Sequence, residues 1–554
     1  MAFLHSRIFK LIIFLVVLGC LLVGRLFYLQ IVNSSKLAVE GLNGRVQEVP
    51  VEVARGIIVD RNGIPLTNTT QRFRIVVFPS QFIDKTIAIE KLAALTGYSR
   101  ESLINRIAKD ARPFKLESDI NMDLAYRINA AKIPGVLAVA ERMRYGYGSL
   151  ASHITGYINT ADNRGVSGIE LIYDERLRGN EPEYAAALVD ATQRIIPGLG
   201  YKRLRLDTGE GPHNVVLTID ARIQKTVEQV MDSQVDKGAI IVMRPSTGEV
   251  LAMASRPNFN ANYILDYLAK DSAPLLNRAV VAYQPGSVFK LVVAAAALEN
   301  EIVRPNDKFF DPGYIDVNHL RFKGWDFERG GRGEITFEQA MAYSSNPVFI
   351  DVGLKLGAQK LVGFAQKLGF GYHTKLDFDG EDDGNLPDPD RIYPGEIANL
   401  AIGQGSFEAT PLQIVSLVAT IANDGIKVDP YIVSRFTLQD GRIITTYNAS
   451  RGTRVLSRKT ALELRHMMAA VTKYGTGQAA YVDTVGSAGK TGSAETGQID
   501  KNGHGVNHAW FAGYAPVDNP QYAVVVFVEE GMSGGDIAAP IFREVVEGII
   551  AKSK

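Results

Sequence analysis

Three short motifs hold residue types that can perform acyl transfer. In the stretch YQPGSVFK, Ser287 follows a Pro-Gly break that favours a helix start, and Lys290 comes three residues later. Residues three apart on a helix share a face, so the two side chains are expected to meet. A lysine with a lowered pKa can accept the serine proton, and the positive end of the helix favours the developing alkoxide. The spacing therefore predicts a serine nucleophile with a lysine base.

A Ser-x-x-Lys pair is a weak signal alone, because about two matches are expected by chance in a chain of this size. Ser487 and Lys490 form a second match. The pattern around them predicts a strand, on which residues three apart face opposite sides. Only the pair Ser287 and Lys290 is therefore expected to bring both side chains together.

Two further motifs follow in the same half of the chain. The sequence AYSSNPVFI contains Ser344 and Asn346 in a polar break between helical stretches, where a hydroxyl and an amide can relay a proton and bind a peptide group. Alone, such a motif is usually a helix cap or a turn. The third motif comprises Lys490, Thr491, Gly492 and Ser493. On a strand, Thr491 and Ser493 point to the same face, which would place two hydroxyls and a cation beside a substrate carboxylate, while Gly492 would let a ligand backbone approach.

The same Gly-Lys-Thr tripeptide raises the alternative of a nucleotide-binding P-loop. That motif needs a glycine five residues before Gly489 and a helix directly after the threonine. Position 484 is Thr, and Gly492, Ser493 and further small residues predict a strand after Thr491. The acyl-transfer interpretation is favoured.

Composition narrows the classes of function. The 554 residues exceed what one core usually serves, so two or three domains are expected. Lys plus Arg and Asp plus Glu balance at 60 each, which argues against a nucleic-acid surface. Cys20 is the only cysteine, so no internal disulfide framework is possible, and the eight histidines lack H-E-x-x-H spacing. No metal and no cofactor is expected.

The N-terminus predicts a membrane anchor. Leu11–Gly24 is an unbroken apolar run that continues past Arg25, and the stretch Phe9–Val32 is long enough to cross a bilayer. Arg7 and Lys10 precede the unbroken run, so the N-terminus is expected in the cytoplasm and the remainder outside. A cleaved signal peptide is the alternative, but no small-x-small site ends the apolar run. Cys20 is expected to be a small membrane-buried side chain.

The rest of the chain alternates strand and helix signals. RGIIVDRNGIPL predicts a hairpin with an Asn62-Gly63 turn, and residues 82 to 145 show helical spacing. The stretch from about 179 to 213 is rich in Gly and Pro and predicts a linker. From Val216 onward, hairpins at both ends of a domain enclose mostly helical segments. The expected fold class is α/β (α+β), with an antiparallel sheet flanked by helices.

The ordered set of Ser-x-x-Lys, Ser-x-Asn and Lys-Thr-Gly resembles that of penicillin-binding proteins and serine β-lactamases. The match is to the class B penicillin-binding proteins, which are membrane-anchored transpeptidases of bacterial wall synthesis, and it runs nearly end to end. It also includes RGIIVDRNG, GVSGIELIYDERLRG, LTIDARIQ, PSTGEVLAMASRPNFN, GQGSFEATPLQ and HAWFAGYAP. The resemblance implies a cytoplasmic tail (1–8), a transmembrane anchor (9–32), an elongated mixed α/β pedestal or dimerisation-like domain (33–215) and a transpeptidase domain (216–554).

The resemblance also implies roles for the site residues. Ser287 would attack the D-Ala-D-Ala amide of a peptidoglycan stem peptide, with Lys290 as its base. Ser344 would pass the proton on, and Asn346 would hold the substrate amide and orient Lys290. Lys490 would help to keep Lys290 neutral and attract the substrate carboxylate, which Thr491 and Ser493 would bind beside Gly492. The backbone amides of Ser287 and Ser493 would form the oxyanion hole, β-lactams would acylate Ser287, and a membrane glycosyltransferase is the implied partner.

Two alternatives share these motifs. A D,D-carboxypeptidase or β-lactamase would let water attack the acyl-enzyme, but such hydrolases generally lack the RGxxxDRNG pedestal. A non-catalytic penicillin-binding sensor or scaffold could use the anchor and pedestal equally well, and the intact Ser287, Lys290 and Lys490 argue against it.

Overall fold

The computed structural model contains two compact units that interleave along the chain. The first comprises Met1–Ala54, Thr70–Met143 and Gly179–Gly211, and the second comprises Arg55–Thr69, Arg144–Arg178 and Pro212–Lys554. The structure describes residues 2–34, 46–109, 112–116, 119–146, 148, 150–190, 194–196, 200–205, 211–499, 503 and 505–553. The first residue of the predicted tail and parts of the predicted pedestal, such as 35–45, lie outside the described residues.

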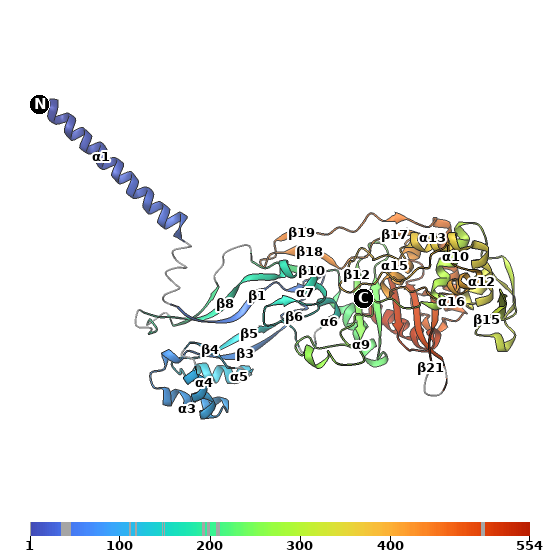
Figure 1. Cartoon of the computed structure of the whole chain (residues 1–554), viewed down its shortest axis with the longest axis horizontal. Coiled ribbons are helices and arrows are strands. Elements are labelled where there is room, and N and C mark those ends of the chain that lie inside the picture. Colours follow the sequence, from blue (N-terminus) through green and yellow to red (C-terminus); the bar gives the residue numbers. More distant parts are fainter. Residues whose placement is uncertain are drawn as a thin grey trace. The chain divides into compact units, whose positions relative to one another are not determined.

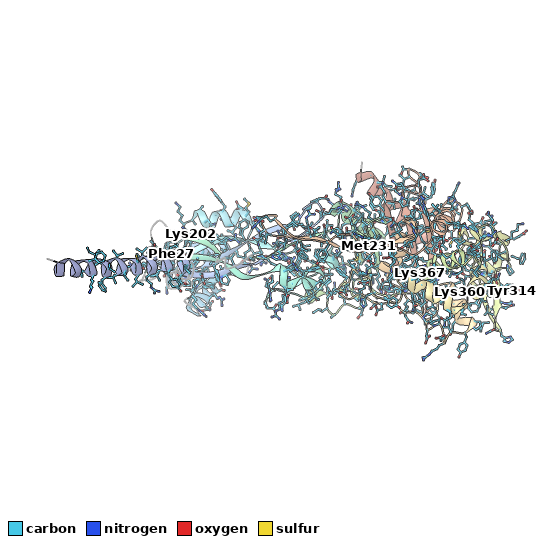
Figure 2. The ribbon with its side chains drawn as sticks, turned by 90° about the horizontal axis from the view of Figure 1, so that it is seen from above. Phe27, Lys202, Met231, Tyr314, Lys360 and Lys367 are labelled. Atoms are coloured by element: carbon cyan, nitrogen blue, oxygen red, sulfur yellow. The ribbon has the colours of Figure 1, made fainter. Side chains whose placement is uncertain are left out.

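The predicted anchor is a helix. Helix α1 (Ala2–Phe27) continues as the short π-helix η1 (Tyr28–Val32), and Phe9–Val32 within them has a mean hydropathy of 2.5. Within the described part of the chain, no side chain from Phe9 to Val32 is buried, and Phe27 is 59% exposed (Figure 2). Such a surface is stable only in an apolar solvent, so the helix fits a single membrane span.

The first unit holds two three-stranded sheets. One has the order β1-β8-β9, built from β1 (Val46–Arg55), β8 (Arg178–Leu188) and β9 (Tyr201–Arg205). The predicted linker after residue 179 is therefore wrong over β8 and β9. The small side chains of Ala185 and Ala187 are buried in the core, so this run forms a strand despite the glycines and prolines around it.

The other sheet of this unit has the order β4-β3-β5, built from β3 (Thr70–Val77), β4 (Phe114–Lys115) and β5 (Val136–Met143). Three helices of this unit pack on the sheet, and their apolar side chains form one core with those of the strands. The helices are α3 (Lys85–Thr96), α4 (Arg100–Lys109) and α5 (Met122–Ala130). The helical prediction for 82–145 is confirmed over α3, α4 and α5 and is wrong over β4 and β5, which are strands.

The second unit is organised around a five-stranded antiparallel sheet with the order β12-β11-β23-β22-β21 (Figure 1). The two hairpins predicted from the ends of this region are confirmed as neighbours in one sheet. Strand β21, which carries the Lys-Thr-Gly motif, lies at the edge. The strands are β11 (Gly238–Met243), β12 (Val250–Arg256), β21 (Ala488–Ile499), β22 (Gly505–Ala515) and β23 (Tyr522–Val528).

Strand alternation gives this sheet two apolar faces. Ile240 and Val242 of β11 pack with α9 (Ala221–Gln234) and α17 (Ala539–Ser553), while Ile241 and Met243 pack in the core that contains the other helices. Those helices are α10 (Lys290–Glu299), α15 (Pro411–Ala422) and α16 (Arg458–Lys473). Because both faces are covered, the central strands β11 and β23 are apolar along their length, whereas the edge strand β21 carries polar side chains.

Shorter elements complete the described parts of both units. The helices are α6 (Ser152–Thr155), α7 (Gly168–Ile172), α8 (Asp174–Leu177), α11 (Phe337–Ala342), α12 (Asn346–Leu356), α13 (Ala358–Leu368) and α14 (Pro394–Ala401), with single turns η2 (Pro79–Gln81), η3 (Ile264–Asp266), η4 (Gly286–Phe289), η5 (Phe327–Arg329), η6 (Gln478–Ala480) and η7 (Gly534–Ala538). The strands are β2 (Ile58–Val59), β6 (Ile158–Asn159), β7 (Arg164–Gly165), β10 (Asn214–Leu217), β13 (Lys308–Asp311), β14 (Tyr314–Val317), β15 (Leu320–Lys323), β16 (Gly333–Thr336), β17 (Ile426–Lys427), β18 (Val433–Thr437), β19 (Ile443–Thr446) and β20 (Thr453–Arg454).

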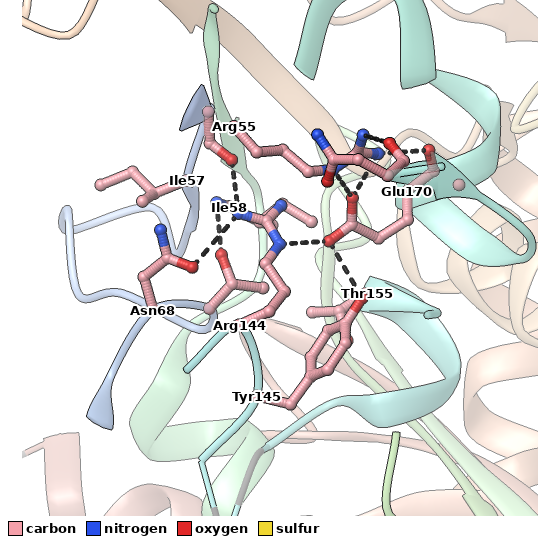
Figure 3. A network of polar contacts seen from close by, with 12 residues as sticks. Arg55, Ile57, Ile58, Asn68, Arg144, Tyr145, Thr155 and Glu170 are labelled. Atoms are coloured by element: carbon pink, nitrogen blue, oxygen red, sulfur yellow. Dashed lines mark hydrogen bonds and ion pairs between the residues drawn. The ribbon is translucent and has the colours of Figure 1, made fainter. Parts of the chain in front are cut away.

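A buried ionic network ties distant segments of the second unit together (Figure 3). Glu170 is fully buried and accepts hydrogen bonds from Arg55 and Arg144 at 2.6 Å each, and from the Tyr145 hydroxyl at 3.2 Å. Arg55 also pairs with Asp174 at 2.8 Å. The motifs around Arg55 and Glu170, which lie 115 residues apart, are thus joined by charge as well as by a shared apolar core.

We predict that Glu170→Gln destabilises the second unit by about 3–5 kcal/mol, because it leaves two buried guanidinium groups without their shared counter-charge. The measurement is the denaturant midpoint of the full chain in detergent. Glu175→Gln is the control, since Glu175 is exposed on the neighbouring helix and its removal should change the free energy of unfolding by less than about 0.5 kcal/mol. Equal midpoints for the two variants would contradict a structural role for the network.

Candidate active site

Ser287 lies in the single turn η4, directly before α10. Residues 290–298 of that helix are all buried, so the helix forms part of the core and holds the turn rigidly. Gly286 has a φ of +53°, and a Cβ there would lie 2.7 Å from the Ser493 carbonyl oxygen. Only glycine permits this close approach between the serine turn and strand β21.

Lys290 is fully buried and its amine contacts the second motif. Nζ donates to the Ser344 carbonyl oxygen and to Asn346 Oδ1 at 2.7 Å each, and lies 3.3 Å from Ser344 Oγ. These contacts use all three donors of an ammonium group. Lys290 and Asn346, predicted to act together, are therefore in direct contact.

Lys490 reaches the same hydroxyl from the sheet. Its amine donates to Ser344 Oγ at 2.8 Å and to the Thr491 carbonyl oxygen at 3.0 Å, and its side chain is fully buried. Strand alternation sends Lys490 inward and leaves Thr491 and Ser493 on the cleft side. The cation therefore lies beneath the predicted carboxylate site rather than beside it.

Ser344 connects the two amines from an unfavourable backbone conformation. It lies between α11 and α12 with a φ of +59°, in the left-handed region that strains a residue with a Cβ. Ser345 caps α12 through a hydrogen bond to the Val348 amide. The polar break predicted around these serines is confirmed, and its sharp turn directs the Ser344 hydroxyl and carbonyl toward the lysines.

The expected direct contact between Ser287 and Lys290 is absent from the described structure: no hydrogen bond there joins the Ser287 hydroxyl to either amine. The acceptors on Ser344 and Asn346 hold the Lys290 amine instead. The hydroxyl that meets both amines is that of Ser344. Sequence spacing alone gave no signal for this, because it depends on where α12 packs.

A cleft of about 1100 Å³ opens beside these residues. Its lining includes Ser287, Ser344, Asn346, Thr491 and Ser493 from all three motifs. It also includes Gln284, Arg321, Phe322, Lys323, Trp325, Thr476, Glu495 and Asp536, which sequence analysis did not single out. Thr476 is placed by a 2.7 Å hydrogen bond to the Thr491 hydroxyl and has no recognisable motif of its own.

Gly492 makes a close contact that the sequence did not predict. A Cβ at this position would lie 2.7 Å from the Pro285 carbonyl oxygen and 2.9 Å from a Val288 methyl. The missing side chain therefore makes room for the serine turn, and the approach of a ligand backbone to Gly492 stays a prediction. Gly286 and Gly492 together bring that turn and strand β21 into contact.

The pKa values of the two lysine amines are both lowered, but by different causes. Burial lowers the pKa of Lys290 well below its usual value, the Lys490 ammonium lowers it further, and Asp311 and Asp326 act in the opposite direction. Burial lowers the pKa of Lys490 to about 7. Lys290 is thus the amine that most readily gives up its proton, which a general base at neutral pH requires.

The other proposed chemistries do not fit this arrangement. Lys490 and Thr491 lie within strand β21, whereas a P-loop lysine opens a helix. Ser487 of the second Ser-x-x-Lys match donates to the Ala480 carbonyl oxygen at 2.7 Å, away from Lys490. In the described part of the chain, no group of three His, Cys, Asp or Glu side chains gathers as a metal site would require.

Comparisons with known proteins identify the family of this chain. Residues 238–547 match the penicillin binding protein transpeptidase domain, and residues 50–200 match the penicillin-binding protein dimerisation domain. Stage V sporulation protein D of Bacillus subtilis strain 168 is 31% identical, covering 98% of this chain and 85% of its own. Peptidoglycan D,D-transpeptidase MrdA of Acinetobacter baumannii is 28% identical, covering 97% and 87%. The chain belongs to the class B penicillin-binding proteins.

A solved structure shares the fold. The D,D-transpeptidase domain of a peptidoglycan glycosyltransferase from Eggerthella lenta superposes with a TM-score of 0.65 at 25% identity, over 91% of this chain and 99% of that one. The likeness agrees with the predicted fold class of a helix-flanked antiparallel sheet with an N-terminal mixed α/β region.

We predict that Lys490→Met moves the acid limb of the pH–rate profile to higher pH. Removing the neighbouring positive charge raises the pKa of Lys290, so more of that amine is protonated at a given pH. The measurement is the second-order rate of labelling by a fluorescent penicillin from pH 5 to 9.

Lys490→Arg is the control for this prediction, because arginine keeps its charge throughout that range. Its acid limb should stay at the wild-type position, and any basic limb near pH 7 that arises from Lys490 should disappear. An acid limb that stays in place or moves to lower pH in Lys490→Met would show that the two amines are not coupled.

Proposed function

We propose that this protein is a membrane-anchored serine D,D-transpeptidase that cross-links peptidoglycan stem peptides through an acyl-enzyme. The observation that carries the proposal is the contact of two buried lysine amines with the Ser344 hydroxyl, on the wall of a cleft that also presents Ser287. A scaffold has no need to bury two amines of lowered pKa against one hydroxyl. Acyl transfer by serine needs such a proton path.

The first step would acylate Ser287. Its hydroxyl proton passes to the neutral amine of Lys290 as the oxygen attacks the carbonyl carbon of the D-Ala-D-Ala amide. The tetrahedral oxyanion is stabilised by the backbone amides of Ser287 and Ser493, and one such donor is typically worth about 3 kcal/mol. The close approach at Gly286 and Gly492 brings these two backbones together.

Collapse of the intermediate would release the terminal D-alanine. Its amine must gain a proton, and the Ser344 hydroxyl can deliver one while drawing on Lys290 or Lys490, which it contacts at 3.3 Å and 2.8 Å. Asn346 fixes Lys290 through its Oδ1, and one N–H is left to bind the substrate amide. The proton transfers through Ser344 thus have a donor and an acceptor in contact.

Substrate orientation would come from strand β21. The hydroxyls of Thr491 and Ser493 face the cleft and can bind the terminal carboxylate, with the buried Lys490 charge directly behind them. An amine of a second stem peptide then attacks the ester carbonyl and loses its proton to Lys290, which forms the cross-link and frees Ser287. β-Lactams would acylate Ser287 because they resemble the same dipeptide.

The anchor defines where this chemistry takes place. Arg7 and Lys10 precede the apolar run that begins at Leu11, so we infer a cytoplasmic N-terminus with the bulk of both units outside the membrane. A transpeptidase of this kind joins strands that another enzyme polymerises, and two of the relatives carry peptidoglycan D,D-transpeptidase in their names. A membrane glycosyltransferase is therefore the proposed partner.

We predict that Ser287→Ala abolishes labelling by fluorescent penicillin and lowers cross-linking of lipid-linked precursor by at least about 10³-fold. Ser487→Ala is the matched control, because Ser487 lies in the other Ser-x-x-Lys pair and faces away from the cleft. It should keep both activities. The ratio of cross-linked to hydrolysed product tests the transpeptidase against a carboxypeptidase, and a wild-type enzyme that yields only hydrolysed peptide would refute the proposed reaction.

A further inference from the structure

The strained turn at Ser344 needs an external support. Its φ of +59° is unfavourable for a side-chain-bearing residue, and such a conformation persists only where the surroundings fix it. Both amines of the proposed proton path depend on that conformation, because Lys290 contacts the Ser344 carbonyl oxygen and Lys490 contacts its hydroxyl. A small relaxation of the turn would move both acceptors.

The support comes from the residues after strand β15. The indole Nε1 of Trp325 donates to the Tyr343 carbonyl oxygen at 2.9 Å, directly before Ser344. Two residues earlier, the Lys323 carbonyl oxygen accepts a hydrogen bond from Asn346 Nδ2 at 3.0 Å, directly after the turn. The motif from Ser344 to Asn346 is thus held on both sides by one short segment.

The segment is itself fixed by several contacts. The Gly324 amide donates to the Gly313 carbonyl oxygen at 2.7 Å, and Asp326, which is 4% exposed, pairs with Arg332 at 2.7 Å. The Arg332 guanidinium lies 4.9 Å from the Trp325 ring centre and 4.5 Å from that of Tyr343. The Arg332 side chain therefore contacts both Trp325 and Tyr343, the residue whose carbonyl oxygen accepts the indole hydrogen bond.

We propose that Trp325 is a positioning residue for the acyl-transfer site. Its indole N–H holds the Tyr343 carbonyl, and so keeps Ser344 and Asn346 where the Lys290 amine meets them. The inference deepens the proposed function and rests on it. It assigns a reason for a large aromatic side chain that remains 54% exposed at the wall of the cleft.

The segment that contains Trp325 also influences the pKa of Lys290, which agrees with a role in positioning the site. Asp326 raises the pKa of Lys290 and so partly offsets the effect of burial, although desolvation remains the larger effect. Asp311 of the adjoining strand acts in the same direction, and the Arg332 amide donates to its carbonyl oxygen at 3.0 Å. The charged groups that influence Lys290 are thus Lys490 on the sheet side and these two carboxylates on the segment side.

Trp325 also lines the cleft, so direct contact with the ligand is the competing explanation. The two roles differ in kinetics. A ligand contact contributes to the dissociation constant of the initial penicillin complex, whereas a positioning residue changes the rate of acylation within that complex. Stopped-flow labelling of the full chain in detergent at pH 7 separates these two constants.

Trp325→Phe keeps an aromatic ring and removes the N–H donor. We expect the acylation rate constant to fall about five- to tenfold, the effect of one lost hydrogen bond, with the dissociation constant within about twofold of wild type. Glu328→Gln is the matched control, because it changes an exposed side chain of the same segment that does not line the cleft. Both of its constants should stay within about twofold.

Three results would overturn the inference: an unchanged acylation rate in Trp325→Phe, a change confined to the dissociation constant, or an equal loss in Glu328→Gln. Failure of the proposed function is distinguishable, because wild-type protein would then show no adduct on Ser287.

If Trp325→Phe does not fold, hydrogen exchange of the indole protons in the wild-type chain tests the same hydrogen bond. The sequence has two tryptophans, and the fully buried Trp510, whose indole donates to the Gln284 carbonyl oxygen at 3.0 Å, is the internal reference. We expect the Trp325 indole to exchange at least about tenfold more slowly than a free indole, whereas exchange at the free rate would refute the bond.

Discussion

Two lysine amines buried against one serine hydroxyl form the interaction on which the catalytic unit depends. Neither Lys290 nor Lys490 has a carboxylate within ion-pair distance among the described residues, and both are fully buried. Two uncompensated ammonium groups cannot both persist in such a place, so one must give up its proton near neutral pH. The structure thereby makes a base from a side chain that is ordinarily charged, and Ser344 lies where protons can pass between the two amines.

The buried carboxylate of Glu170, in the same unit, is paired with groups of opposite charge, unlike the two lysine amines. Glu170 is as buried as the lysines, yet two guanidinium groups donate hydrogen bonds to it at 2.6 Å and hold it in place. Removing a charge from water costs free energy in both places. Around Glu170 the oppositely charged guanidinium groups offset that cost, whereas the lysine amines of the active site have no such partner among the described residues. The first arrangement joins distant segments of the chain, and the second creates reactivity.

The backbone around the site is built for close approach. Strand β21 is the edge strand of its sheet, so its outer side is free to meet the serine turn instead of another strand. Gly286 and Gly492 remove the two Cβ atoms that would keep these segments apart. On the other side, the segment around Trp325 holds the strained turn at Ser344. Rigid elements therefore meet the reactive groups from three directions, which keeps the acceptors of both amines in place.

The sequence by itself determined the motifs, the apolar anchor and the strand and helix pattern from Val216 onward, because these are local properties of side-chain type and spacing. It misassigned β8 and β9, whose alanine-rich strands lie among glycines and prolines and are stabilised only by their partners. The tertiary structure alone decided that Ser344, rather than Ser287, receives both amines, that Gly492 accommodates the serine turn, and that Thr476 and Trp325 belong to the site. Those outcomes depend on contacts between residues far apart in the chain, which no spacing rule encodes.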